Sequence, residues 1–223
     1  MGGNDHGRPT MAQKIVKKTR LARRAERKVR LLDAAIAVIA HKGLIGITMN
    51  DIAREAGCSY GVVAFHYKSK DGVLLAALDK LVEEYERIWK EHAAAGTGPA
   101  VQLRAMLDSD FDRRVGNRGR IAVWSAFWAE APRNAAYRKR CAEVKKRYDT
   151  MTEDNVRQLA SAEGLRLDAT SIARGLNAMI DGFWIANQVA GTGGPSDRVA
   201  AKRACLQYLR AFFPDEPQFA PAN

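Results

Sequence analysis

Residues 48–75, TMNDIAREAGCSYGVVAFHYKSKDGVLL, constrain the possible fold more than any other part of the chain. Thr48 and Ser59 are residue types that begin helices well, because each side-chain oxygen can accept a hydrogen bond from the first turn. Gly57 stands between them and can adopt the left-handed conformation that ends a helix. The segment therefore predicts two short helices joined by a tight turn, followed by a longer helix from about residue 70 to 95.

The distribution of charge adds a second constraint. The 223-residue chain has a net charge of +11, which favours a polyanionic partner. Residues 1–30 contain ten Lys or Arg and two acidic residues, whereas residues 31–92 contain seven basic and nine acidic residues. Two short helices with a tight turn can place one helix in the major groove of DNA, and the basic stretch can bind phosphates. The arginines expected on one basic helix face are Arg20, Arg23, Arg24 and Arg27, and a solvated run of charge is the alternative.

The rest of the chain shows helical spacing and no strand pattern. The sequence GTGP at residues 96–99 is the clearest break, and Gly and Pro residues separate the segments after it. Helices are predicted at about 100–115, 120–130, 133–162, 168–190 and 196–213. The predicted fold class is therefore all-α, with a small N-terminal three-helix head and a larger helical body.

Two groups of residues resemble a known family. Residues 48–61 follow the order T-x-x-D-I-A-x-x-A-G-x-S-x-G, which resembles the head of the TetR family of bacterial repressors. In the body, AVWSAFWAEA (122–131) and NAMIDGFWIA (177–186) resemble the choline-responsive repressors of the BetI type. The resemblance implies a TetR-like fold, with a helix-turn-helix head and a helical body for ligand binding and dimerisation.

The domain organisation follows from this resemblance and from the break points. The expected parts are a disordered tail (1–13), a helix-turn-helix DNA-binding domain with a basic N-terminal arm (14–72), a ligand-binding and dimerisation domain (73–213), and a frayed tail (214–223). The family implies a homodimer formed through the last two long helices, at about 168–190 and 196–213. The implied partners are a palindromic double-stranded DNA operator and a small choline-like cation.

The resemblance assigns DNA contacts position by position. Thr48 and Lys70 lie where the family binds phosphates with the start of a helix, and His66 lies at a phosphate-contacting position. The residues implied to face the bases are Asn50, Ser59, Tyr60, Gly61 and Val62, and Tyr67 completes the DNA-binding set. Ala64 departs from the family because many members have a phosphate-binding Tyr there, and we expect the basic arm to compensate.

A set of aromatic side chains and one acid predicts the ligand site. Trp124 and Trp128 are four residues apart on one helix face, with Phe127 beside them. Asp181 and Trp184 lie in an otherwise apolar helix. A quaternary ammonium has no N–H group, so aromatic faces and a nearby carboxylate are the groups that can bind it. We therefore predict a cage for choline or a related cation, with ordinary core packing as the alternative.

Other interpretations stay open. A buried carboxylate needs a partner, and Arg174, seven residues before Asp181, could supply it instead of a ligand. The body pocket could instead bind lipophilic or multidrug-like compounds, or it could hold an enzyme site built from Asp181 with Tyr148 or Cys141. The basic arm alone could give a DNA binder indifferent to sequence. The favoured function is a repressor that senses choline or a related compound and controls its uptake or conversion to glycine betaine, with no enzymatic activity and no cofactor.

The composition also predicts a location. No apolar run approaches the ~20 residues of a membrane-spanning helix, and residues 1–13 lack the apolar core of a signal peptide. The three cysteines form no spaced pair, which fits a reducing compartment, and the four histidines show no metal-ligand spacing. The chain is therefore expected in the cytoplasm, without a membrane partner and without a metal.

Overall fold

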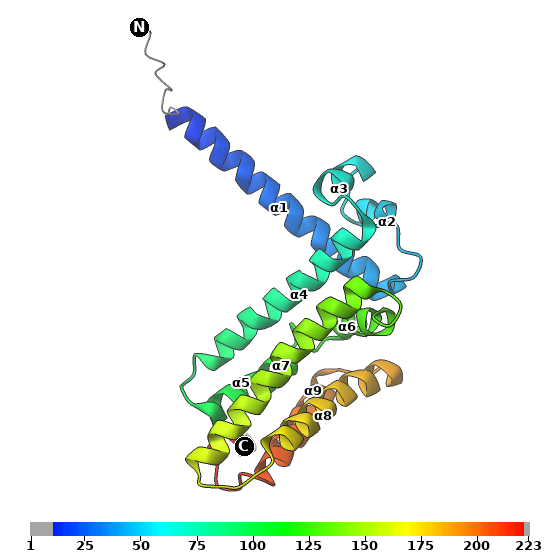
Figure 1. The fold of residues 1–223 in the computed structure, drawn as a ribbon. Helices are drawn as coiled ribbons and strands as arrows, with labels where there is room; N and C mark the ends of the chain where they lie inside the picture. The colour runs from blue at the N-terminus through cyan, green and yellow to red at the C-terminus, as the bar shows by residue number, and fades with distance from the viewer. Residues whose placement is uncertain (1–10, 221–223) are drawn as a thin grey trace.

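The fold is given by a computed structural model that describes the backbone of residues 11–220 and the side chains of residues 22–220. Within residues 11–220 there are nine α-helices, one short 3-10 helix and no strand, which confirms the predicted all-α class. Figure 1 shows the first three helices at one end of a long fourth helix, with the sixth helix beside the first. The fifth and seventh helices pack on the fourth, and the eighth and ninth lie beyond the seventh. Among the described residues, no helix combines the length and apolarity that crossing a membrane requires.

The first helix, α1 (Met11–Lys42), begins inside the predicted disordered tail. Its first half contains no Gly or Pro, so nothing in the sequence ends the helix before the core segment. The second half buries Leu31 and Ile39 in the head. The first half projects away from the other helices (Figure 1), and the side chains of residues 22–30 are exposed. The side chain of Arg20 lies outside the described residues, as do residues 1–10 of the predicted tail.

The two short helices of the head match the predicted pair: α2 (Met49–Glu55) and α3 (Tyr60–His66). Thr48 Oγ1 accepts a hydrogen bond from the backbone N–H of Asp51 (3.1 Å), and Asp51 Oδ2 accepts one from the backbone N–H of Thr48 (2.9 Å). This reciprocal cap fixes the start of α2. Gly57 has a φ of +62°, and this left-handed conformation allows the sharp turn between the helices.

The body helices lie close to their predicted ranges. They are α4 (Lys70–Ala93), α5 (Pro99–Asp110), α6 (Arg118–Glu130), α7 (Ala135–Ala162), α8 (Ala169–Ala190) and α9 (Pro195–Arg210). α5 ends well before the predicted residue 115, because Asp112 Oδ1 accepts a hydrogen bond from the Arg114 N–H (2.7 Å) and turns the chain. α4 packs on α5, α7 packs on α5 and α8, and α8 packs on α9.

The chain after α9 is folded as far as residue 220, so the prediction of a frayed tail is wrong there. A 3-10 helix spans Pro217–Phe219, and Phe219 is fully buried against Phe213, with 6.2 Å between ring centroids. Arg104 Nη1 on α5 donates to the backbone oxygen of Gln218 (2.7 Å). Burial of one aromatic ring and this hydrogen bond hold the segment on the bundle.

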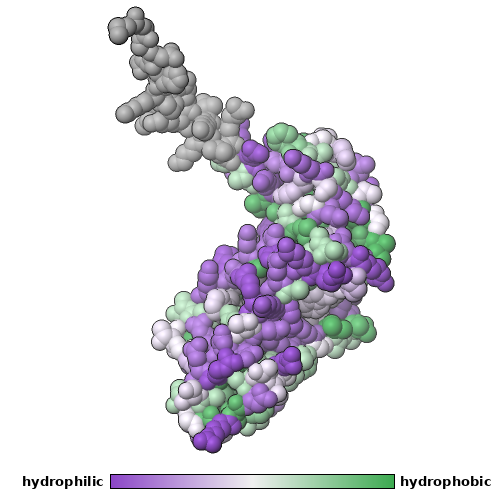
Figure 2. Space-filling model, viewed as in Figure 1, coloured by the Kyte–Doolittle hydropathy of each residue, from purple (hydrophilic) through white to green (hydrophobic). Residues whose placement is uncertain are grey.

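The head meets the body at more than one place. α4 belongs to both, α6 packs against α1, and α7 contacts the N-terminal half of α4. Tyr137 Oη on α7 donates to Asp71 Oδ1 on α4 (2.5 Å), and Arg140 Nε donates to Asp79 Oδ1 (2.6 Å). Hydrophilic side chains cover the middle of the face in Figure 2, where α4 and α7 run in Figure 1. α6 and α7 therefore contact helices of the head directly.

Candidate functional site

Helix α3 presents most of its predicted base-facing residues to solvent. Ser59, Tyr60 and Gly61 are exposed, and Tyr60 keeps 53% of its surface accessible. Ser59 occupies the N-cap position but forms no side-chain cap, so its hydroxyl is not used to begin α3. Val62 is half-buried against the head core, so only part of its side chain faces outward.

The predicted phosphate-binding residues lie at helix starts. Thr48 precedes α2 and Lys70 begins α4, and both are exposed, as is Asn50 in the first turn of α2. The unpaired N–H groups and the dipole at a helix start favour an anion. Tyr67 is half-buried, and burial raises the pKa of its hydroxyl, which therefore stays a hydrogen-bond donor near neutral pH.

Phe65 was not predicted from the sequence, yet it is a prominent surface residue of α3. Its side chain is 72% exposed, and the Arg24 guanidinium carbon lies 5.8 Å from its ring centroid, a cation–π distance. This contact brings the basic half of α1, with exposed Arg23 and Arg27, beside the recognition helix. The sequence pattern of α3 identifies Val63 as a buried residue. It does not indicate that Phe65, on the opposite face, is exposed.

His66 lies half-buried at the end of α3. Burial lowers the pKa of its imidazole, and the charges of Arg24, Lys28 and Arg27 lower it further. The ring is therefore neutral at pH 7, and it contacts Phe65 edge-on with 5.3 Å between ring centroids. A neutral imidazole can still donate one hydrogen bond to a phosphate, while the positive charge beside α3 comes from α1.

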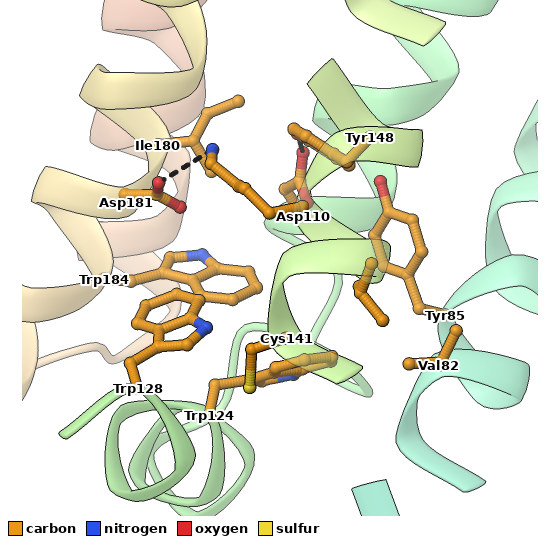
Figure 3. A pocket seen from close by; sticks show the side chains of 12 residues that line it. Val82, Tyr85, Asp110, Trp124, Trp128, Cys141, Tyr148, Ile180, Asp181 and Trp184 are labelled. Atoms are coloured by element: carbon orange, nitrogen blue, oxygen red, sulfur yellow. Dashed lines mark hydrogen bonds and ion pairs between the residues drawn. The ribbon is translucent and has the colours of Figure 1, made fainter. Parts of the chain in front are cut away.

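The body contains a cavity of about 90 Å³ between α4, α5, α6, α7 and α8 (Figure 3). Its lining is mainly aromatic and aliphatic with three charged side chains: Val82, Tyr85, Asp110, Trp124, Trp128, Cys141, Val144, Lys145, Tyr148, Ile180, Asp181 and Trp184. Of the five residues predicted to bind a ligand, Trp124, Trp128, Asp181 and Trp184 meet here. The i, i+4 spacing in α6 and the acid in α8 thus led to the same cavity.

Three indole rings form one wall of the cavity. The ring centroids of Trp124 and Trp128 are 6.3 Å apart, and those of Trp128 and Trp184 are 6.4 Å apart with planes only 14° from parallel. Figure 3 shows the Trp184 ring below Asp181 and the Trp128 ring stacked on the other face of Trp184. The Trp184 Nε1–H is buried and has no hydrogen-bond partner among the described residues, so it can donate to a bound molecule.

Phe127 does not line the cavity. It is fully buried and packs edge-on against Tyr137, with 5.3 Å between ring centroids. Phe127 precedes Trp128 by one residue and is therefore turned about 100° round the helix, away from the indole wall. Phe127 was predicted to bind the ligand, but in the structure it packs α6 against α7.

Asp110, at the end of α5, was not predicted from the sequence. Its side chain is 2% exposed, and Tyr148 Oη donates to its Oδ2 (2.6 Å), while the Tyr85 hydroxyl lies nearby without a well-formed hydrogen bond. Burial raises the pKa of Asp110 to about 7, although the Tyr148 hydrogen bond opposes this and the charge of Asp181 adds to it. From the sequence, Asp110 looks like an ordinary polar residue at a helix end. Its burial could not be predicted, because residues of α4 and α7 cover it only in the folded protein.

Asp181 is paired with Lys145, so the suggestion that Arg174 pairs with it is wrong. Lys145 Nζ on α7 lies 3.1 Å from Asp181 Oδ2 and 3.2 Å from Asp149 Oδ1, whereas Arg174 is exposed on α8. Burial acts to lower the pKa of Lys145, but Asp181 and Asp149 outweigh it and raise the pKa. The partner comes from another helix, and spacing along α8 could not identify it.

The residues of the enzyme alternative also meet in this cavity, but their chemistry is unsuited to nucleophilic catalysis. Burial raises the pKa of the Cys141 thiol, and burial with the charge of Asp110 raises the pKa of Tyr148, so both groups are protonated near neutral pH. Within the described part of the chain, no three His, Cys, Asp or Glu side chains converge as metal ligands.

Known proteins share both halves of the chain. A family model described as the C-terminal part of BetI-type transcriptional repressors matches residues 99–214, and one described as bacterial regulatory proteins of the tetR family matches residues 31–77. The HTH-type transcriptional regulator BetI of Stenotrophomonas maltophilia is 32% identical over 184 residues, covering 82% of this chain and 91% of that protein. The BetI regulator of Burkholderia thailandensis is 29% identical over 192 residues, covering 85% and 95%.

Solved structures share the fold. A transcriptional regulator from Pseudomonas aeruginosa PAO1 gives a TM-score of 0.74 at 22% identity, covering 86% of this chain and 92% of that chain. A transcriptional regulator from Saccharomonospora viridis, solved in complex with choline, gives 0.71 at 23% identity, covering 83% and 96%. The two family models and the BetI relative at 32% identity show that the chain belongs to the BetI-type transcriptional repressors of the TetR family and is a DNA-binding regulator.

Proposed function

We propose that the protein is a homodimeric repressor that binds a palindromic operator with its head and a small quaternary ammonium compound such as choline with its body. The observation that carries the ligand half is the cavity in Figure 3, which three indole rings and two carboxylates line together. The choline-bound regulator from S. viridis, which shares the fold, supports this choice of ligand. The regulated genes would then serve choline uptake or its conversion to glycine betaine.

The energetics of the cavity suit a metabolite sensor. Each cation–π contact contributes about 0.5–2 kcal/mol, more when water is excluded. Contacts with Trp124, Trp128 and Trp184, together with a carboxylate, would support a Kd between about 1 μM and 1 mM. The Trp184 Nε1–H and the Tyr85 hydroxyl, both buried without partners among the described residues, could hydrogen-bond the oxygen of choline.

The charge of the cavity favours a small cation over lipophilic or multidrug-like compounds. Asp110 is buried in the cavity wall, and the ion pairs of Lys145 are with Asp181 and Asp149. A neutral ligand would therefore leave the ionised form of Asp110 without the compensation that a cation supplies.

On the DNA side, we infer a division of work between α3 and α1. Exposed Ser59 and Tyr60 would contact base edges, and the Tyr60 ring could pack against a thymine methyl. Lys70 and the basic residues of segment 22–30 would bind phosphates, which supply much of the affinity but little sequence preference. The Arg24–Phe65 contact supports this arrangement, because it holds the basic helix beside α3 before DNA binds.

Dimerisation is inferred through α8 and α9. Ala178, Gly182, Ile185 and Val189 are exposed along one side of α8 at spacings of four, three and four residues. Ile185 and Val189 keep 48% and 83% of their surface accessible, and Val199 on α9 keeps 63%. Such an apolar stripe is buried when a second copy packs against it, and the small residues allow the helices to approach closely.

The contacts between body and head suggest how a ligand would act. Trp124 and Trp128 lie on α6, which packs on α1, and Tyr137 and Arg140 join α7 to α4. The two heads of a dimer must be about 34–36 Å apart to reach both half-sites of an operator. A ligand that moves α6 or α7 would change this spacing, with a typical coupling of about 1–3 kcal/mol.

Operator binding tests the proposed function. Duplexes selected from a random pool by the purified protein should contain an inverted repeat with half-sites about one helical turn apart. In a mobility shift at fixed salt, saturating choline should weaken binding to this operator by about 5- to 150-fold. Selection of sequences without an inverted repeat would contradict the operator half, and unchanged affinity with choline would contradict the ligand half.

Replacing Trp184 with Leu tests the indole wall. Loss of one cation–π contact should weaken choline binding by about 2- to 30-fold in calorimetry. Trp89→Leu is the matched control, because Trp89 lies on α4 outside the cavity and its replacement should leave affinity unchanged. Equal affinities of wild type and Trp184→Leu would show that the cation binds elsewhere.

The ionisation of Asp110 predicts a pH dependence of ligand binding. The charged groups and titratable side chains that face it are Tyr85, Lys145, Tyr148, Asp181 and Cys205. Burial raises the pKa of both tyrosines and of Cys205, and Lys145 also has a raised pKa, so none of these four titrates between pH 6 and 8. Asp110, with a pKa of about 7, changes from neutral to negative across this range.

A permanent cation binds the ionised form of Asp110 more tightly, so affinity for choline should rise with pH. The expected increase from pH 6 to pH 8 is up to about tenfold, levelling off above the pKa of Asp110. The variant Asp110→Asn keeps an acceptor for Tyr148 and should bind more weakly with a flat profile. A profile that falls with rising pH, or that keeps its slope in Asp110→Asn, would be incompatible with this role.

A further inference from the structure

The ammonium group of Lys145 lies in the cavity proposed for the ligand. Its Nζ is 3.1 Å from Asp181 Oδ2 and 5.6 Å from the centroid of the Tyr148 ring, and Figure 3 marks the ion pair. These are a carboxylate and an aromatic face, the two kinds of group that a bound quaternary ammonium would contact. The chain's own cation therefore makes interactions of the type that the cavity offers to a ligand.

We propose that Lys145 is a built-in competitor for the cationic ligand and that it sets the charge specificity of the cavity. A ligand gains access to Asp181 only by displacing the Lys145 ammonium. This inference rests on the proposed function, because it assumes that a cation occupies the cavity. Lys145 is thus a specificity-determining residue rather than a passive part of the wall.

The structure provides a place for the displaced ammonium. Lys145 Nζ is already 3.2 Å from Asp149 Oδ1, one turn further along α7. Asn177 Nδ2 on α8 donates to Asp149 Oδ1 (2.7 Å) and so holds that carboxylate in position. The Lys145 and Asp149 side chains are 44% and 45% exposed, so water can hydrate the ammonium after it leaves Asp181. After displacement, the Lys145 ammonium would pair with Asp149 alone, and the cationic ligand would pair with Asp181. No buried charge would be left without a partner.

The exchange accounts for selection by charge. A neutral molecule cannot replace the ammonium at Asp181 without leaving that carboxylate uncompensated. A quaternary ammonium would replace the charge and in addition contact the indole wall, whereas the Lys145 ammonium lies over the Tyr148 ring. Lys145 lowers the affinity for every cation but rejects neutral molecules of the same shape, which is the usual way in which a site gains specificity at the expense of affinity.

The test compares variants of Lys145 by calorimetry with choline and with its neutral carbon isostere, 3,3-dimethylbutan-1-ol. Lys145→Met keeps the apolar stem and removes the ammonium, so choline affinity should rise by up to about fivefold, which corresponds to the upper end of the range for an exposed ion pair. Lys145→Arg keeps the charge and should show no gain. Lys146→Met removes the same charge from an exposed neighbour on α7 and should leave affinity within about twofold of wild type.

Several outcomes distinguish this inference from the proposed function. Tighter choline binding in Lys145→Met, with no gain in the two controls and no binding of the isostere to wild type, supports it. Unchanged or weaker choline binding in Lys145→Met, when wild type binds choline, overturns it and leaves the proposed function intact. Absence of choline binding in every protein overturns both. Lys145→Gln is a second neutral variant, measured in the same way if thermal unfolding shows that Lys145→Met is not folded.

Discussion

The carboxylate of Asp110 is buried where five helices meet, and the arrangement of the body depends on how its charge is compensated. An isolated buried carboxylate is strongly unfavourable, so it must accept hydrogen bonds, take up a proton or face a cation. Tyr148 supplies the hydrogen bond, and the pKa of about 7 leaves the proton easily exchanged. Asp181 adds a second negative group to the same cavity, and Lys145 balances it. Lys145 therefore balances Asp181, while the charge of Asp110 is balanced only when that carboxyl is protonated.

The same helices that surround this cavity connect the body to the head. α6 carries two of the indoles and packs on α1. α7 carries Lys145 and Tyr148, and its N-terminal residues Tyr137 and Arg140 hydrogen-bond to α4. The cavity and the DNA-binding head are thus joined by two sets of contacts, one between α6 and α1 and one between α7 and α4. The contacts of α6 with α1 and of α7 with α4 could not be predicted from the sequence, because contacts between distant helices leave no trace in local spacing.

The parts that were predictable from the sequence depend on local physics. The Thr48 cap, the turn at Gly57 and the ends of α4, α6, α7 and α8 arise from neighbouring residues, and their predicted positions agree closely with the structure. Trp124 and Trp128 were also grouped correctly by helical spacing. Asp110 and Lys145 could not be found in this way, because each gains its role from a residue 36 or 38 positions away in the chain. The buried end of the chain at Phe219 was missed for the same reason.

Reciprocal coupling between the two sites tests the central claim most directly. Choline would be titrated calorimetrically into the protein alone and into the protein saturated with its operator, at one salt concentration and one pH. The account predicts that operator DNA weakens choline binding by the same factor by which choline weakens operator binding. Equal choline affinity in the presence and absence of operator would contradict the claim that the charge-balanced cavity and the DNA-binding head act on one conformational equilibrium.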